Sequence, residues 1–342
     1  MVRTITIVSL SSGVLGEAFV KHEVDIGIRR LNAYGINVKF AEHALKGMAY
    51  LKAHPEDRAA DLLQAFQDPE TDMILCAIGG DDTYRLLPYL FEHDELKNCI
   101  ADKIFLGFSD TTMNHLMLHK IGLPSFYGQA FLPDICELDS QMLPYTKKYF
   151  EELLQTGMIR EIHPSDVWYQ SRSDFSTEAV GTEMKSYKNQ GFELLQGSRT
   201  FSGEILGGCI DSIYDIFNAE RYADSADMCC RYNLFPSMED WKGKILLLES
   251  SEEQPAPEKY CRMIEVLKQT GIFSVLAGVL IGKPMDEKYF EEYKKILIRV
   301  IDDPGLPVVC NINIGHATPR CIIPFGVYAR VDADQQVIRF LQ

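Results

Sequence analysis

Three polar residues of the types used in nucleophilic catalysis each follow an apolar run of the chain. Ser109 follows IFLGF, Glu249 follows KILLL and His316 follows PVVCNINIG. A serine hydroxyl becomes a nucleophile when a base removes its proton, and histidine, with an ordinary pKa of about 6.5, is the usual base. The histidine in turn needs a carboxylate that fixes its tautomer and stabilises its charged form. These residue types therefore predict an acyl-transfer triad, whatever their order along the chain.

The stretch Lys103–Lys120, KIFLGFSDTTMNHLMLHK, predicts how the nucleophile is held. Ile104–Leu106 indicates a buried strand, Gly107–Thr111 a sharp turn, and Thr112–Lys120 a helix. A serine between a strand and a helix projects from the backbone, beside free N–H groups and the positive end of the helix dipole. The same Ser-Asp pair is also what an ordinary helix N-cap contains, so this stretch alone leaves both interpretations open.

The other two members of the triad have alternatives nearby. Glu252 and Glu253 compete with Glu249 as the orienting acid, or they form the solvated first turn of a helix. Glu249 is preferred because it follows the buried strand directly. His316 stands in a Gly-His context before a proline-punctuated loop, but a single loop histidine is also a common surface residue.

An oxyanion hole needs two backbone N–H donors within about 3 Å of the developing charge. The N–H of Asp110, directly after the nucleophile, is one natural donor. The Gly79-Gly80 pair ends the neighbouring apolar run MILCAI and could supply the other, because glycine lets the backbone come close. A tight turn or a phosphate-binding loop would use the same pair, but the chain has no G-x-G-x-x-G or Walker pattern there.

Two further features are candidate binding sites. Arg85 follows the Gly-Gly turn and could meet a substrate carboxylate or phosphate, or could pair with Asp81 or Asp82 to hold the turn. His115 and His119 lie four residues apart on one helix face, but without a third ligand nearby the pair indicates an ordinary helix surface. We therefore expect no metal and no cofactor.

The elements that would position these residues form an alternating pattern. Apolar runs and helix-period segments alternate through residues 1–160 and predict an α/β fold with a doubly wound parallel sheet. Residues 161–200 lose the pattern and are expected to be the domain crossing plus a long substrate loop. Residues 201–342 predict a mixed α/β domain that carries the glutamate and the histidine. The main boundaries expected are helices at Met142–Leu154, Pro257–Thr270 and Tyr289–Ile301, and strands at Met73–Ile78, Ser125–Tyr127 and Val275–Ile281.

The amino-acid composition limits the partners and the cellular compartment to be expected. The 342 residues are 46% hydrophobic and 24% charged, with a formal net charge of −15, which argues against nucleic acid or an anionic membrane as the main partner. The opening MVRTITIVSLSS lacks the apolar core of a signal peptide. Nine cysteines without a C-x-x-C motif indicate reduced thiols. We therefore expect a cytoplasmic protein.

With these residues assembled, the chain resembles the LD-carboxypeptidase family of serine peptidases. The resemblance implies Ser109 as nucleophile, Glu249 as orienting acid and His316 as base, with an oxyanion hole from the N–H groups of Gly80 and Asp110. It also implies two domains with the site between them, and often a homodimer. The matching segments follow the family's order and cover nearly the whole chain: IGGDDTYRLLPYL, GFSDTT, GEILGGCIDSI, LLLESSEEQPAPE and GHATPRCIIPFG.

Within that family the chain looks closer to the microcin C self-immunity (MccF-like) branch than to the murein-recycling carboxypeptidases. ESSEEQPAPE and the aromatic loop HPSDVWYQSRSDF carry this likeness. Relatives of that branch cleave the amide between a peptidyl or aminoacyl group and a modified nucleotide, and an aromatic residue of the loop stacks on the base. Trp168 is the candidate here, with Tyr169 and Phe175 as alternates, although a Trp buried at the domain junction fits equally well. Asp81 and Glu252 are expected as further substrate contacts.

Three functions are therefore compared. The first is a serine hydrolase that acts on an aminoacyl- or peptidyl-nucleotide and gives immunity or detoxification. The second uses the same residues to remove D-Ala from a murein tetrapeptide. The third belongs to another class: a binding protein that protects by sequestration, with an inert triad. It predicts that Ser109→Ala would leave protection intact.

Overall fold

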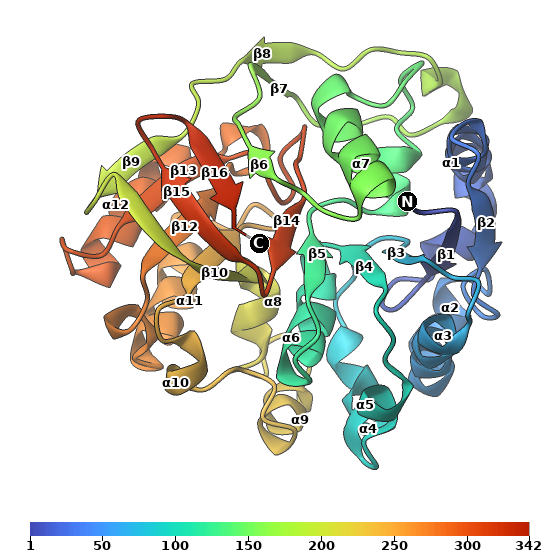
Figure 1. Cartoon of the computed structure of the whole chain (residues 1–342), viewed down its shortest axis with the longest axis horizontal. Coiled ribbons are helices and arrows are strands. Elements are labelled where there is room, and N and C mark those ends of the chain that lie inside the picture. Colours follow the sequence, from blue (N-terminus) through green and yellow to red (C-terminus); the bar gives the residue numbers. More distant parts are fainter. Residues whose placement is uncertain (342) are drawn as a thin grey trace.

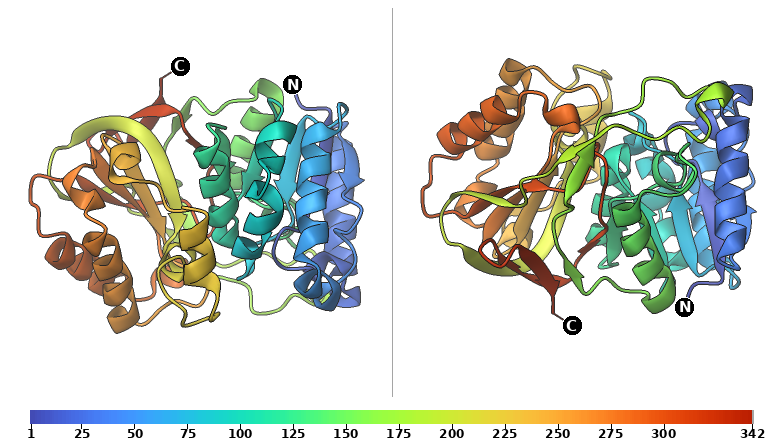
Figure 2. Two further views of the ribbon diagram at one scale, coloured as in Figure 1. Left: turned by 90° about the horizontal axis from the view of Figure 1, so that it is seen from below. Right: turned by 90° about the horizontal axis from the view of Figure 1, so that it is seen from above.

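The computed structural model describes residues 1–341 as two α/β halves that lie side by side (Figures 1 and 2). One half is built on a six-stranded sheet and the other on an eight-stranded sheet. Buried apolar side chains form one continuous cluster through both halves, so the two sheets are packed as a unit. Within residues 1–341, no helix is long and apolar enough to span a bilayer.

The first sheet is the doubly wound parallel sheet that the sequence predicts. Its strands follow the spatial order β14-β5-β4-β3-β1-β2, with β14 antiparallel to β5 and the others parallel. α1 and α7 cover one face, and α3 to α6 cover the other (Figure 1). The strands are β1 Thr4–Val8, β2 Asn37–Phe40, β3 Met73–Cys76, β4 Ile104–Gly107, β5 Ser125–Tyr127 and β14 Ile323–Phe325. The helices are α1 Lys21–Ala33, α2 Met48–Ala53, α3 Pro55–Gln67, α4 Leu87–Phe91, α5 Glu95–Cys99, α6 Thr112–Lys120 and α7 Pro144–Thr156.

This strand order creates a crevice at the carboxyl ends of β1 and β3. The chain runs outward from β1 to β2 and then returns to place β3 on the other side of β1. Connections leave the carboxyl ends of β1 and β3 in opposite directions, and open α/β sheets bind ligands at such a point. The segments that follow β1 and β3 contain Ser11 and Gly80, respectively. A ligand site is therefore expected between them.

The second sheet is mixed, as predicted. Its order is β6-β16-β15-β10-β11-β12-β13-β9, in which β10 to β13 are parallel and the flanking strands are antiparallel. α11 and α12 pack against each other beside it. The strands are β6 Glu161–Ile162, β9 Glu193–Gln196, β10 Thr200–Cys209, β11 Ile245–Glu249, β12 Gly278–Gly282, β13 Val308–Ile312, β15 Tyr328–Asp332 and β16 Val337–Phe340. The helices are α8 Ile210–Asp215, α9 Ser225–Arg231, α10 Met238–Trp241, α11 Pro257–Gln269 and α12 Phe290–Ile301.

Residues 161–200 contain more regular structure than the predicted crossing and loop. β6 and β9 join opposite edges of the second sheet, and β7 Val167–Tyr169 pairs with β8 Ser186–Lys188 in a separate hairpin. Strands of two to four residues are too short to show a period of two in the sequence. Pairing with partners far along the chain is what forms them.

Several boundaries differ from the sequence prediction for local reasons. α7 begins at Pro144 and not at Met142, because proline is favoured in the first helical turn, where its missing N–H is not needed. β12 begins at Gly278 and not at Val275, because Ile272–Ser274 form a 3-10 turn and the Val275 carbonyl accepts a hydrogen bond from Gly243. The strand β14 was not predicted, since its three residues become a strand only by pairing with β5.

Candidate active site

The three predicted catalytic residues meet where the two halves adjoin. The Ser109 hydroxyl lies 3.0 Å from Nε2 of His316, and Nδ1 of His316 lies 2.8 Å from Oε2 of Glu249. They come from the turn after β4, the last residue of β11 and the loop after β13. A carboxylate only accepts hydrogen bonds, so Nδ1 carries a proton and donates to Glu249. When Nε2 is unprotonated it faces the serine as an acceptor, which is the arrangement a general base needs.

Ser109 has the backbone geometry of a strained nucleophile turn. Its φ is +65°, in the left-handed region that non-glycine residues rarely adopt. The turn is held by two hydrogen bonds: the Ser109 N–H donates to the Tyr127 hydroxyl at 3.1 Å, and the Thr112 hydroxyl donates to the Ser109 carbonyl at 2.7 Å. The surrounding structure therefore fixes the serine at the start of α6.

Glycine is required at position 79 because the backbone lies against the nucleophile. A Cβ there would stand 2.6 Å from Cβ and 2.7 Å from Oγ of Ser109. The same approach brings the two predicted oxyanion donors, Gly80 and Asp110, to the wall of one pocket with Ser109. Their role in binding an oxyanion stays a prediction.

Glu249 is held by a residue that sequence reasoning missed. The buried Tyr127 hydroxyl donates to Oε1 of Glu249 at 2.6 Å while it accepts the Ser109 N–H. Burial and the neighbouring carboxylate raise the pKa of Tyr127 well above its ordinary value, so the hydroxyl remains a donor. Tyr127 thus connects the acid and the nucleophile on the side away from His316. The feature of the sequence that could have pointed to Tyr127 is its position at the end of β5, the strand beside the one that leads to Ser109.

The loop that carries His316 is positioned by Arg320, which was also not predicted. The buried Arg320 donates to the Gly315 carbonyl at 2.7 Å and to the Asp134 carboxylate at 2.8 Å. Gly315 has a φ of +83°, and a Cβ on it would stand 2.3 Å from Oε2 of Glu249. The loop therefore needs glycine directly before the histidine, both for its conformation and for the approach of the acid.

Glu252 makes a second contact with the base. Its Oε2 lies 2.8 Å from Nε2 of His316, the same atom that faces Ser109. Burial disfavours the charged imidazole, but Glu249 and Glu252 outweigh it and raise the pKa of His316 to about 10. The hydrogen bond to His316 lowers the pKa of Glu252 to about 2. The two carboxylates therefore favour the charged form of His316, which cannot accept the serine proton.

We expect Glu252→Gln to move the acid limb of the kcat/KM profile to lower pH, by about one unit. A raised pKa keeps the proton on His316 until the pH passes that value, and the neutral base exists only above it. Loss of one of the two carboxylates lowers this pKa, so the base becomes available at lower pH. The measurement is kcat/KM against pH for the wild type and the variant.

The matched control is Glu253→Gln. Glu253 is the neighbouring acid, and it contacts Arg221 at 2.6 Å and Lys259 at 3.7 Å but not the histidine. This variant is expected to leave the acid limb close to the wild-type position. Equal shifts in the two variants would show that general charge, and not the contact with His316, sets the pKa.

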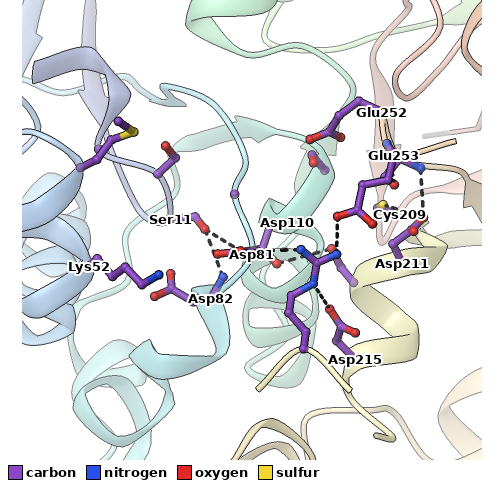
Figure 3. A pocket seen from close by; sticks show the side chains of 18 residues that line it. Ser11, Lys52, Asp81, Asp82, Asp110, Cys209, Asp211, Asp215, Glu252 and Glu253 are labelled. Atoms are coloured by element: carbon purple, nitrogen blue, oxygen red, sulfur yellow. Dashed lines mark hydrogen bonds and ion pairs between the residues drawn. The ribbon is translucent and has the colours of Figure 1, made fainter. Parts of the chain in front are cut away.

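A cavity of about 390 Å³ opens beside Ser109 (Figure 3). Its walls come from the segments after β1 and β3, from α2, from the turn after β4, from the end of β10, from α8 and the segment after it, and from the segment after β11. It therefore lies at the crevice that the strand order predicts and extends to the second half of the molecule. The lining residues are Ser11, Ser12, Gly13, Met48, Lys52, Gly80, Asp81, Asp82, Ser109, Asp110, Cys209, Asp211, Ser212, Asp215, Arg221, Ser251, Glu252 and Glu253.

Two of the predicted substrate contacts, Asp81 and Glu252, line this cavity, whereas Arg85 does not. Arg85 pairs with Asp224 at 3.0 Å and lies 3.7 Å from Asp82. The contact with Asp82 matches the turn-holding alternative, and the binding of a substrate carboxylate or phosphate by Arg85 stays a prediction. A guanidinium near acidic side chains forms such pairs readily, and the partner at position 224 could not be found from local sequence.

Trp168 is buried, with 9% of its surface exposed, and it is not part of the cavity wall. Its ring stacks on Tyr187 with centroids 4.6 Å apart, within the β7–β8 hairpin. The burial matches the alternative of a Trp at the domain junction. Its use as a stacking platform for a nucleobase stays a prediction.

His115 differs from the expected surface residue. It is fully buried, and its Nε2–H donates to the Gly107 carbonyl at 3.1 Å. Its Nδ1 then accepts from the Ser125 hydroxyl at 2.7 Å, so the ring connects β4 and β5 behind the nucleophile. Burial lowers its pKa to about 3, so the ring is neutral. The nearly uniform burial of α6, on all sides of the helix, is why the face pattern was misleading.

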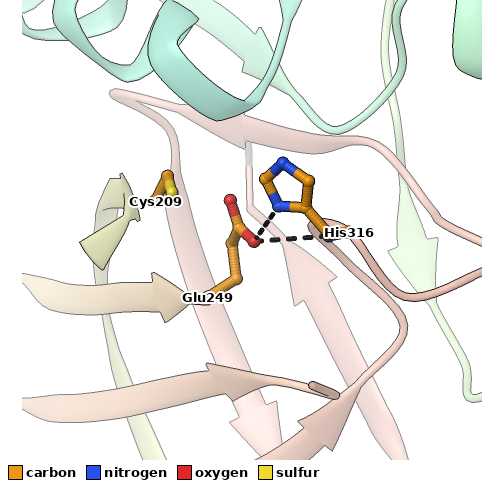
Figure 4. A group of neighbouring side chains, drawn as sticks. All are labelled: Cys209, Glu249 and His316. Carbon is orange, nitrogen blue, oxygen red and sulfur yellow. Dashed lines mark hydrogen bonds and ion pairs between the residues drawn. The ribbon is translucent and has the colours of Figure 1, made fainter. Parts of the chain in front are cut away.

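One group of side chains has the composition of a metal site (Figure 4). Cys209, Glu249 and His316 each offer one ligand atom within 4.8 Å of the others. Glu249 and His316 are already joined by a 2.8 Å hydrogen bond. Burial raises the pKa of Cys209 well above its ordinary value, while metal binding requires the thiolate. The donor set fits a hydrogen-bonded triad better than a metal centre.

Comparison with known proteins identifies the family of the chain. Sequence models of the LD-carboxypeptidase N-terminal and C-terminal domains match residues 5–128 and 202–331. The chain belongs to the LD-carboxypeptidase family. The fold, the family and the class of enzyme, a serine peptidase that hydrolyses amides, are therefore confirmed.

Individual relatives place the chain near the MccF-like members of the family. The crystal structure of an MccF-like protein from Streptococcus pneumoniae, in complex with AMP, is 62% identical, covers 100% of this chain and 99% of that one, and has a TM-score of 0.99. The microcin C7 self-immunity protein MccF of Escherichia coli is 25% identical over 97% of this chain and 92% of its own length. A Treponema pallidum protein named "Putative carboxypeptidase" is 28% identical over 90% and 84%.

Proposed function

We propose that this LD-carboxypeptidase family member cleaves the amide bond that joins an aminoacyl or peptidyl group to a nucleotide, and so gives immunity or detoxification. The observation that carries the proposal is the chain of contacts from Ser109 through His316 to Glu249, at 3.0 and 2.8 Å, beside a cavity of about 390 Å³. The AMP complex of the 62% identical protein supports a nucleotide portion in the substrate.

The reaction follows from the positions of these atoms. Oγ of Ser109 attacks the carbonyl carbon of the amide while Nε2 of His316 takes the hydroxyl proton, after the substrate has displaced Glu252 from that nitrogen. The N–H groups of Gly80 and Asp110 stabilise the oxyanion. His316 then gives the proton to the leaving nitrogen, and the acyl group stays on Ser109 as an ester.

Water completes the cycle. His316 removes a proton from a water molecule that attacks the ester carbonyl, and the same proton passes to Oγ of Ser109 as the acid is released. Glu249 stays ionised throughout and stabilises the charged imidazole. We further propose a homodimer in the cytoplasm as the working form.

The second candidate is removal of D-Ala from a murein tetrapeptide, which uses the same triad. It is retained because the family models that match the chain describe LD-carboxypeptidases. Sequestration without chemistry is less favoured, because an inert protein has no use for a strained serine aligned with a histidine and a buried acid.

The test is a mass spectrum of the products after purified protein meets an aminoacyl sulfamoyl adenosine or, separately, a murein tetrapeptide. We expect release of the free amino acid from the first compound only, and none with Ser109→Ala protein. Loss of D-Ala from the tetrapeptide alone would instead assign the protein to cell-wall recycling. Cleavage of neither compound would favour a binding protein that protects by sequestration.

A further inference from the structure

The cavity beside Ser109 is strongly acidic. Seven carboxylate side chains line it, against two cationic ones, Lys52 and Arg221. Arg221 contacts three of the acids, with Glu253 at 2.6 Å, Asp215 at 3.1 Å and Asp81 at 3.6 Å. Burial raises the pKa of Asp215 to about 6, even with Arg221 beside it. Three of the seven acids, Asp82, Glu252 and Glu253, also contact cations outside the lining, namely Arg58, His316 and Lys259. Together with Lys52 and Arg221, these cations leave the wall with a formal excess of two negative charges.

Two other acids of the wall are already used by the protein. Asp82 is paired with the buried Arg58 at 2.6 Å. Asp110 accepts hydrogen bonds from Ser11 at 2.7 Å and from the backbone and hydroxyl of Thr83 at 2.9 and 2.6 Å. These contacts hold the segments around the nucleophile, so neither acid explains why the remaining carboxylates gather at the same cavity.

Asp211 has one carboxylate oxygen without a partner among the described residues 1–341. The residue is 5% exposed and lines the cavity. Its Oδ2 accepts the Ser251 N–H at 3.0 Å, but Oδ1 has no hydrogen-bond partner among residues 1–341. A buried carboxylate oxygen without a donor costs free energy, so native proteins supply the donor from a water molecule or from a ligand. Asp211 is thus a preformed acceptor in an acidic wall.

We propose that this cavity binds an ammonium group on the acyl part of the substrate, with Oδ1 of Asp211 as its buried acceptor and with Asp215 and Glu253 supplying further negative charge. The inference rests on the proposed function and specifies its substrate class. An ammonium group brings three donors and a positive charge, so it satisfies the unused oxygen and the excess charge together. Its source is the α-amine of the acyl residue or the side chain of a basic one, such as lysine. An acidic acyl group is repelled.

Four ligands with the same nucleoside separate these sources: lysyl, norleucyl, N-formylnorleucyl and glutamyl sulfamoyl adenosine. Their dissociation constants are measured by calorimetry on Ser109→Ala protein, which cannot turn them over. Norleucine matches lysine in length without the side-chain amine, and formylation removes the charge of the α-amine. Going from the lysyl to the norleucyl compound removes the side-chain charge, and going from the norleucyl to the N-formylnorleucyl compound removes the α-amine charge. We expect at least one of these two changes to weaken binding about tenfold or more, and the glutamyl compound to bind more weakly than the lysyl one.

Two variants test whether the acids are responsible. Asp211→Asn, made in the Ser109→Ala protein, is expected to remove most of the preference for the charged ligand. Glu253→Gln, at a more exposed position, is expected to reduce it in part, so the test does not depend on one buried substitution. Asp334→Asn is the control, since that acid pairs with Arg199 at an exposed site outside the cavity. The preference is also expected to fall with added salt.

The outcomes separate this inference from the proposed function. Equal affinity for all four ligands, tighter binding of the glutamyl compound, or no binding of the lysyl compound would overturn the ammonium site. An unchanged preference in both acid variants would overturn the assignment to Asp211 and its neighbours. Cleavage is measured separately with wild-type protein: failure to cleave a lysyl compound that binds with the expected preference would reject the proposed hydrolysis and leave the ammonium site standing.

Discussion

Ser109→Ala is expected to lower kcat for amide hydrolysis by at least about 10⁴-fold while the affinity for substrate stays within a few-fold of the wild type. The hydroxyl is the group that forms the bond to the carbonyl carbon, and the remaining oxyanion donors and binding contacts cannot replace it. The measurement is the single-turnover rate together with the dissociation constant for an aminoacyl sulfamoyl adenosine. A rate close to that of the wild type would contradict covalent catalysis by this residue.

A second substitution at the same position controls for folding. Ser109 has a φ of +65°, which glycine adopts freely and alanine does not. Ser109→Gly is therefore expected to be as inactive as Ser109→Ala but more stable, by about 1 kcal/mol in the free energy of unfolding. Thermal and denaturant unfolding measure the difference. If both variants are equally inactive while their stabilities differ in this way, the activity is lost because the nucleophile is missing and not because the turn is damaged.

Glu249→Gln is expected to lower kcat by about 10⁴-fold with little change in structure. The Tyr127 hydroxyl accepts the Ser109 N–H and donates to Oε1 of Glu249, so in the variant the amide oxygen takes that side. The NH₂ group of the new side chain then faces Nδ1 of His316 and forces the ring proton onto Nε2. The base is thereby blocked at the atom that faces the serine. Steady-state kinetics and the pH profile measure the loss.

Tyr127→Phe supplies the control for this explanation. Without the hydroxyl, the side-chain amide that Glu249→Gln introduces is free to turn its oxygen toward His316 and restore the working tautomer. The double variant is therefore expected to be more active than Glu249→Gln alone, although Tyr127→Phe by itself lowers activity. Strictly multiplicative losses in the two variants would mean that the tautomer argument is wrong.

Much of the site could be predicted because it is attached to the ends of parallel strands. Ser109 and Glu249 directly follow or end buried apolar runs, and such runs are visible in sequence. His316 stands four residues beyond its strand, yet the residue types needed for acyl transfer singled it out. The turn around Ser109 was likewise predictable, because a strand, a turn and a helix follow one another within Lys103–Lys120.

The parts that were missed depend on contacts between distant segments. Tyr127 and Arg320 orient the acid and the histidine loop through partners up to 186 residues away, and no local pattern indicates such pairs. The same applies to β14, which exists only by pairing with β5. Asp224, which engages Arg85, lies 139 residues away from it. Position along the chain gave no sign that this arginine is already paired.

The acidic cavity is another feature that could not be predicted from the sequence. The formal net charge of −15 suggested only what the protein does not bind. The structure concentrates part of that charge beside the nucleophile, drawn from the segment after β3, the turn after β4, α8 and the segment after β11. No single stretch of sequence contains this cluster. Folding assembles it, and it is this cluster that specifies an ammonium-bearing substrate.

Labelling with a fluorophosphonate shows whether Ser109 is a nucleophile activated by His316. Intact mass spectrometry is expected to find one adduct per chain, on the peptide that contains Ser109, and none in Ser109→Ala protein. Labelling is expected to be much slower in Glu249→Gln, because its base is blocked. An unlabelled Ser109 in a sample that still hydrolyses its substrate would contradict the account.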